Sequence, residues 1–188
     1  PVALSASRGV IRADDPEAAL TAAARIREIL DAEGRVTAEP LLVEEYIPGD
    51  EVAVEGLLRD GALEVLAIFD KPDPLTGPYF EETIYVTPSR HPRAMLDSIT
   101  RVTTAAATAI GLTEGPVHAE LRCDTSTDRC FVIEVAARSI GGLCSRALRF
   151  GTGVSLEEVI LRHALSLPLD ALQREEQASG VMMLPIPT

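Results

Sequence analysis

The stretch that decides the fold is residues 118–142, which read HAELRCDTSTDRCFVIEVAARSIGG. Two apolar runs with alternating polar positions flank a polar turn from Asp124 to Arg129, a pattern that predicts an antiparallel hairpin. Each expected strand carries one acid, Glu120 or Glu134, in an otherwise apolar setting. Burying a carboxylate is costly unless it is paired or bound to a metal ion. The hairpin is therefore a candidate metal site.

Carboxylate oxygens are the ligands that a hard cation such as magnesium prefers, and few protein ligands are needed beside phosphate oxygens. The alternative for each acid is an ion pair with Arg122 or Arg138, but two acids on one hairpin weaken that alternative. Arg138 follows Glu134 by four residues, at the expected strand end. Its guanidinium could hold a substrate carboxylate or an acyl phosphate, or form a surface pair of little energetic weight. His118 alternates in phase with Glu120, although a packed histidine is an equal alternative.

A second motif lies upstream, where residues 42–51 read LVEEYIPGDE. The apolar run that begins at Leu41 predicts a buried strand, which leads into a Pro-Gly turn with Glu51 just beyond it. A backbone carbonyl and N–H at such a strand end can pair with an adenine edge, and a nearby carboxylate can accept both ribose hydroxyls. The alternative is a strand followed by a solvated acidic turn.

Two further candidates are weaker. Residues 5–10 read SASRGV, so small side chains would let backbone N–H groups approach an anion and Arg8 could add a cation. An ordinary surface loop is the favoured interpretation of that segment. Lys71 precedes a proline-rich loop and could reach a phosphate, but a solvated lysine is favoured for it.

Local signals predict the order helix, hairpin, helix, hairpin, helix. Asp15 before Pro16 is typical of a helix start, Ser155 and Glu158 form a capping box, and Asp60-Gly61 is a two-residue hairpin turn. The helices are expected near 16–33, 92–110 and 155–165, and the strands near 52–58, 63–69, 116–123 and 130–137. We therefore predict an α+β fold with antiparallel β-sheets flanked by helices.

Composition excludes several classes of function. The 188 residues are 46% hydrophobic, enough for one core or two small lobes. A formal net charge of −12 argues against nucleic acid and anionic membranes as partners. No apolar run approaches the roughly 20 residues that cross a bilayer, and no secretory leader or C-x-x-C pair is visible. The expectation is a reduced, cytoplasmic chain.

Taken in order, these motifs resemble the ATP-grasp superfamily, in particular its branch of carboxylate–amine (amino-acid) ligases. The resemblance runs from Ser5 to about Leu167, and it implies an ATP-grasp fold, ATP and magnesium as cofactors, and a small carboxylate and an amine as substrates. It implies nucleotide-binding roles for Ser5, Ser7, Arg8, Gly9, Glu44, Glu45, Tyr46, Ile47 and Glu51, to which Lys71 is added from its place before the proline-rich loop. It further implies that Glu120 and Glu134 bind magnesium, and that Arg138 and the substrate-side acid Glu82 act in catalysis.

The chain departs from the family pattern at three places. The family usually has Glu-x-Asn on the last metal strand, whereas Ala136 stands at the Asn position here, so one magnesium contact is missing or supplied by water. Tyr85 replaces a frequent histidine. The usual phosphate-binding lysine would precede Pro1. We therefore expect that the chain is cut from a longer protein at both ends and is inactive by itself.

The resemblance also implies an organisation in three parts. Residues 1–47 are the remainder of the first lobe, residues 48–169 form the second lobe with the metal and substrate site, and residues 170–188 begin a truncated C-terminal region. Apolar strands unpaired at the cuts would allow a homodimer. The alternatives are an enzyme similar to biotin carboxylase and a non-catalytic nucleotide-binding or oligomerisation module.

Overall fold

The computed structural model describes residue 4 and residues 7–35, 40–151, 153–169 and 172–184. The helices within these ranges are α1 (Pro16–Ala32), α2 (Arg93–Ala109) and α3 (Leu156–Ala164), with a short 3-10 helix η1 (Cys144–Ala147). The strands are β1 (Asp50–Arg59), β2 (Ala62–Lys71), β3 (Ile84–Thr87), β4 (Gly115–Asp124), β5 (Arg129–Ala136) and β6 (Ser179–Met182). The chain separates into a first unit, residues 1–47 and 74–82, and a second unit, residues 48–73 and 83–188.

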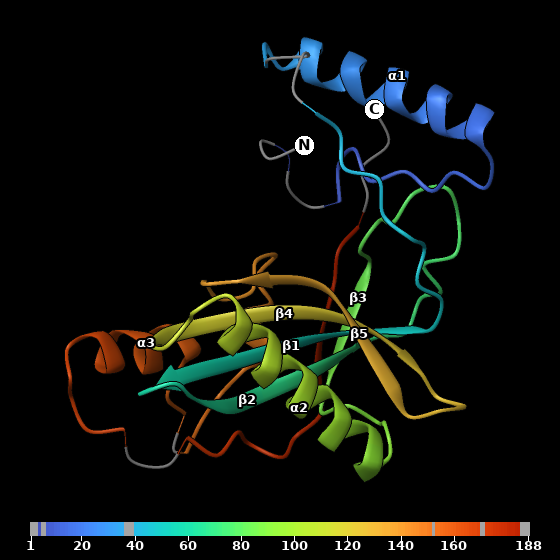
Figure 1. Cartoon of the computed structure of the whole chain (residues 1–188). Coiled ribbons are helices and arrows are strands. Elements are labelled where there is room, and N and C mark those ends of the chain that lie inside the picture. The colour runs from blue at the N-terminus through green and yellow to red at the C-terminus, as the bar shows by residue number, and fades with distance from the viewer. Residues whose placement is uncertain (1–3, 5–6, 36–39, 152, 170–171, 185–188) are drawn as a thin grey trace. The chain divides into compact units, whose positions relative to one another are not determined.

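The second unit is built on one six-stranded sheet in the order β5-β4-β1-β2-β3-β6 (Figure 1). Every neighbouring pair is antiparallel, which confirms the predicted α+β fold. Both predicted hairpins form, β1 with β2 and β4 with β5. The turn between β1 and β2 places Asp60 and Gly61 at φ of 50° and 78°, as a tight turn with two left-handed residues requires.

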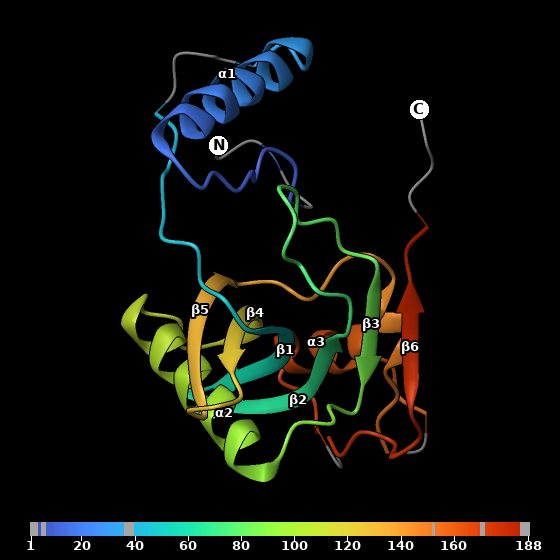
Figure 2. The same cartoon turned by 90° about the vertical axis from the view of Figure 1, so that its right-hand side faces the viewer.

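The two faces of this sheet carry different layers. Val52 and Val54 of β1 pack with Met95 and Ile99 of α2 on one face. The intervening residue Ala53 belongs to a second apolar cluster, because successive strand residues point to opposite faces. That second cluster also holds apolar residues of segment 140–150 and of α3. Figure 2 shows α2 across one face of the sheet, with β3 and β6 paired at one edge.

The first unit contains α1, whose predicted start is confirmed. The Asp15 carboxylate accepts a hydrogen bond of 2.8 Å from the backbone N–H of Ala18, and Pro16 occupies the first helical position. Leu30 is buried, whereas Leu20 is 74% exposed. Of these two leucines, only the one near the C-terminal end of the helix is therefore covered.

The strand predicted to begin at Leu41 is wrong. Residues 40–48 form neither helix nor strand, and the side chains of Leu42 and Val43 are 76% and 85% exposed. A strand needs a partner to satisfy its backbone hydrogen-bonding groups, and none of the described strands pairs with this segment. The apolar run alone did not show that the segment would lack a partner strand. Regular pairing begins only at Asp50, the first residue of β1.

In the described part of the chain, no helix has both the length and the apolar character needed to span a bilayer.

Candidate functional site

A cluster of charged side chains, which we call the charged cluster, lies on one face of β1, β2 and β4. Their side chains are between 3% and 13% exposed, apart from Glu55 at 1%. Members of the charged cluster are Glu51, Glu55, Lys71, His118, Glu120 and Arg122. Glu51 lies directly opposite both Lys71 and Arg122 on the neighbouring strands, and Glu55 lies opposite His118. Glu51 and Glu55 thus face basic groups in cross-strand pairs, the arrangement that stabilises a sheet.

Lys71 lies at the centre of the charged cluster. Its Nζ is 2.7 Å from Oε1 of Glu51 and 3.0 Å from Oε1 of Glu120. The second oxygen of Glu51 accepts a bond of 2.9 Å from Nε of Arg122. The favoured interpretation of a solvated lysine is therefore wrong, because burial and two acids hold this ammonium in place. The ribose-binding role of Glu51 and the phosphate-binding role of Lys71 stay predictions.

His118 connects two acids of the charged cluster. Its Nδ1 lies 2.5 Å from Oε1 of Glu55, and its Nε2 lies 3.4 Å from Oε1 of Glu120. Burial lowers the pKa of His118, but the contacts with Glu120 and Glu55 outweigh it and raise that pKa to about 9. Burial raises the pKa of the Glu55 carboxyl, against the opposing effect of His118.

Glu120 is held in its ionised form. Burial would raise its pKa, but the hydrogen bond with His118 and the charge of Lys71 lower the pKa to about 2. An ionised carboxylate is the form that binds a hard cation. Glu134 lies directly opposite Glu120 in the β4–β5 register, so the predicted pair of acids is brought together at one position of the hairpin.

Glu134 has different surroundings from Glu120. Its side chain is 52% exposed, and its Oε1 lies 3.2 Å from Nη2 of Arg138, which is 53% exposed. The register shifts between Glu120 and Leu121, so that Ile133 is an extra residue immediately before Glu134. Such a β-bulge redirects the neighbouring side chain and often lies beside an active site.

Two opposed carboxylates fit the chemistry of magnesium. No group of three or more His, Cys, Asp or Glu side chains within the described ranges is arranged to hold a metal ion. Magnesium usually keeps several waters and takes one or two carboxylates together with phosphate oxygens. Glu120 and Glu134 match that requirement, and Ala136 adds no ligand in place of the asparagine expected from the resemblance.

Glu55 is the residue of the site that the sequence did not single out. Its Oε2 accepts a hydrogen bond of 3.0 Å from the backbone N–H of Ile140, 85 positions along the chain. The one available signal was alternation, because Glu51 and Glu55 are four residues apart on one strand and therefore share a face. Nothing in the sequence indicated that the backbone N–H of Ile140 would bond to Glu55.

The remaining predicted residues, apart from Ser5, which lies outside the described residues, belong to the first unit. Ser7 and Gly9 adopt φ of 56° and 77° in a tight turn, and Arg8 pairs with Glu33. The side chains of Glu44 and Glu45 are exposed. The roles predicted for these residues stay predictions.

Tyr46 is held by its neighbours in the first unit. Its ring stacks on Phe80 at 6.3 Å between centroids, and the guanidinium of Arg12 lies 4.1 Å above it. Ile47 and Glu82 are half-buried in the same unit. A rigid aromatic ring next to a backbone segment is consistent with the adenine-binding prediction without testing it.

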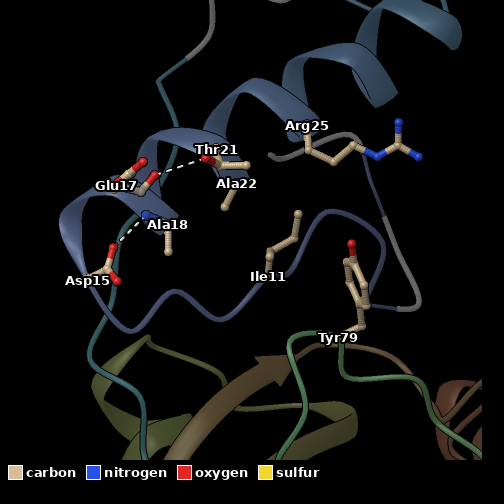
Figure 3. A pocket seen from close by; sticks show the side chains of 8 residues that line it. All are labelled: Ile11, Asp15, Glu17, Ala18, Thr21, Ala22, Arg25 and Tyr79. Atoms are coloured by element: carbon tan, nitrogen blue, oxygen red, sulfur yellow. Dashed lines mark hydrogen bonds between the residues drawn. The ribbon is translucent and has the colours of Figure 1, made fainter.

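The first unit also has a hollow of about 490 Å³ along α1 (Figure 3). Ile11 and Tyr79 face the first turns of the helix, and their segments meet in an isolated antiparallel bridge. The other residues that line the hollow are Asp15, Glu17, Ala18, Thr21, Ala22 and Arg25. None of the residues predicted to bind nucleotide, metal or substrate lines it.

The antiparallel sheet agrees with the family that sequence comparison finds. Residues 1–147 match the model of the ATP-grasp domain, and the chain belongs to the ATP-grasp family. The predicted family is thereby confirmed. No curated protein matches the chain.

Solved structures similar to the chain include several enzymes. L-amino acid ligase from Bacillus licheniformis is 28% identical with a TM-score of 0.71, over 94% of this chain and 44% of that one. The biotin carboxylase domain of Hydrogenobacter thermophilus 2-oxoglutarate carboxylase, a dimer solved with MgADP and bicarbonate, is 20% identical with a TM-score of 0.68, over 95% and 39%. Phosphoribosylglycinamide synthetase from Anaerococcus prevotii is 15% identical with a TM-score of 0.63, over 92% and 42%. The chain spans less than half the length of each.

Proposed function

We propose that the protein is an ATP- and magnesium-dependent ligase that joins a small carboxylate to an amine through an acyl phosphate. The observation that carries the proposal is the direct opposition of Glu120 and Glu134 on β4 and β5, with Arg138 bonded to Glu134. This arrangement provides a place for a cation next to a guanidinium that can bind a carboxylate. Membership of the ATP-grasp family supports ATP as the phosphoryl donor.

The proposed reaction has two steps. A carboxylate oxygen of the substrate attacks the γ-phosphorus of ATP, the bond to the bridging oxygen breaks, and ADP leaves. The amine nitrogen then attacks the acyl carbon, phosphate leaves, and the nitrogen gives up a proton. Neither step needs a covalent bond to the protein, so positioning and charge neutralisation carry the catalysis.

The residues of the chain have separate tasks in this proposal. Glu120 and Glu134 hold magnesium, which neutralises charge on the phosphoryl oxygens when it is bound. Arg138 is half-exposed, so its planar group is accessible to a substrate carboxylate, which it can bind through two parallel hydrogen bonds. Lys71 keeps Glu120 ionised and oriented.

The two predicted lobes divide the work in the same proposal. The segment up to residue 47 supplies the phosphate loop and the adenine-binding backbone, and residues 48–169 supply the metal and substrate site. The similarity to an L-amino acid ligase at 28% identity supports an amino acid as one substrate, with Glu82 as the substrate-side acid.

The test is a screen of carboxylate and amine pairs with the full-length protein, ATP and magnesium, followed by phosphate release and by mass spectrometry of the product. We expect phosphate release to require both the carboxylate and the amine, and the product to contain both. Release that depends on bicarbonate and biotin would instead assign a carboxylase. Nucleotide binding without release for any pair would leave only a non-catalytic module.

A further inference from the structure

Glu55 is a buried carboxylate with two different partners. It lies in the middle of β1 between Ala53 and Leu57, which are both fully buried on the same face. Oε1 of Glu55 is 2.5 Å from Nδ1 of His118, and Oε2 accepts a 3.0 Å bond from the backbone N–H of Ile140. One side chain thus ties together two segments that are distant in sequence.

Both tied segments lead to residues of the proposed active site. His118 lies two residues before Glu120 and contacts that carboxylate through its other ring nitrogen, at 3.4 Å. Ile140 lies two residues after Arg138. Glu55 therefore connects the strand that carries one acid of the opposed pair to the turn that carries the substrate-binding arginine.

The turn beyond Ile140 needs such an anchor. Gly142 and Leu143 both have positive φ, 60° and 64°, and Leu143 is not a residue that adopts this conformation readily. Among the described residues, the Arg138 guanidinium bonds only to neighbours within four positions, Glu134 and the carbonyl of Ser139. The bond from Ile140 to Glu55 is a long-range contact through which a buried side chain holds this turn.

Stability alone is a weak reason for a carboxylate at this position. Replacing a buried ion pair by well-packed apolar side chains is often neutral or stabilising. A buried charge with both oxygens occupied does define one arrangement of its partners, because any other arrangement leaves a polar group unsatisfied.

We propose that Glu55 is a positioning residue, which fixes the turn of Arg138 relative to Glu120 so that the substrate carboxylate lies in line for phosphoryl transfer. The inference rests on the proposed ligase function. Glu55 acts through Ile140 and His118, and its effect is on the geometry of the site rather than on its chemistry.

The test compares Glu55→Leu and Glu55→Gln in the full-length protein. Leucine keeps the volume but removes both acceptors. Glutamine keeps an acceptor for the N–H of Ile140, and its amide can donate to His118 in the neutral tautomer. The matched control is Glu64→Gln on β2, an exposed acid paired with Arg59.

We expect Glu55→Leu to lower kcat about tenfold, which corresponds to about 1.4 kcal/mol, and to raise KM for the carboxylate severalfold. The Kd of MgATP should stay within about twofold, because the hydrogen-bond partners of Glu55, His118 and Ile140, are not among the residues predicted to bind nucleotide. Glu55→Gln should restore most of the lost kcat, and Glu64→Gln should behave as the unmodified protein. A purely structural role would lower the amount of active enzyme and leave KM for the carboxylate unchanged, which would overturn the proposal.

Hydrogen exchange of the Ile140 amide separates the failure of this inference from the failure of the proposed function. We expect slow exchange in the unmodified protein and faster exchange in Glu55→Leu, whatever the activity. Unchanged exchange would show that Glu55 does not hold the turn. A protein that releases no phosphate for any substrate pair would remove the ligase function and the positioning role with it. Should Glu55→Leu fail to fold, Glu55→Asp replaces it, because its shorter carboxylate cannot reach both partners; unchanged KM and exchange in that variant would equally overturn the proposal.

Discussion

The two opposed acids of the β4–β5 hairpin share a register position but differ in almost everything else. Glu120 is 13% exposed and is held by Lys71 and His118 within the charged cluster. Glu134 is 52% exposed and bonds only to Arg138 among the ion pairs of the described residues. The difference follows from the order of the sheet, in which β4 is interior and β5 is an edge strand.

This asymmetry separates stability from function along one hairpin. An acid inside a buried, balanced cluster contributes to folding, and its removal leaves a charge without compensation. An exposed pair contributes little to folding, between about 0 and 1 kcal/mol. We therefore expect Glu120 to serve both the fold and the metal, and Glu134 to serve the metal alone. Three experiments test the comparison, from the largest expected effect to the smallest.

The largest effect is expected for Glu120→Ala. In this variant Lys71 still pairs with Glu51 and His118 still pairs with Glu55, but the charged cluster loses one of its three buried acids. We expect the free energy of unfolding to fall by about 3 kcal/mol, measured by urea denaturation. Glu28→Ala, at an exposed pair with Arg25 on α1, is the control and should change stability by less than about 0.5 kcal/mol. An effect at Glu120 as small as that of the control would contradict the buried role of the cluster.

The next effect concerns activity rather than folding. Glu134→Gln keeps the shape of the side chain but removes the negative charge offered to magnesium. We expect kcat of the full-length ligase to fall about a hundredfold, which corresponds to about 2.7 kcal/mol, while the urea midpoint stays within error of the unmodified protein. Glu28→Gln serves as the matched control for the substitution. Retained turnover in Glu134→Gln would remove Glu134 from the metal site.

Local patterns were sufficient to predict the hairpins, the helix starts and the place of Glu120 and Glu134 on the two strands of one hairpin. Turn chemistry and alternation are properties of neighbouring residues, so the register at Asp60-Gly61 and the shared face of His118 and Glu120 could be read directly. The family resemblance added the chemical roles. The structure then confirmed the antiparallel α+β fold.

The burial of each acid could not be predicted, because it depends on pairing between distant segments. Glu120 is buried because β4 pairs with β1 and because Lys71 of β2, 49 positions earlier in the chain, contacts it. Glu55 was missed for the same reason, because its partner at Ile140 is remote. The strand wrongly predicted at Leu41 is the opposite kind of error. Its apolar run has the composition of a strand, but none of the described strands pairs with it.

The smallest effect, and the sharpest test of the comparison, is the difference between two coupling energies. Double-mutant cycles would pair Glu120 with Lys71, at 3.0 Å, and Glu134 with Arg138, at 3.2 Å, with unfolding free energies measured for each single and double variant. Because the two distances are nearly equal, geometry alone predicts similar coupling energies. The difference in burial predicts different coupling energies. We expect more than about 1 kcal/mol for the buried pair and less than about 0.5 kcal/mol for the exposed pair. Salt should reduce the second value further, because exposed charges are screened and buried ones much less so. Equal coupling energies in the two cycles would mean that burial does not distinguish the two acids. That result would contradict the proposal that Glu120 has a structural role and Glu134 a purely functional one.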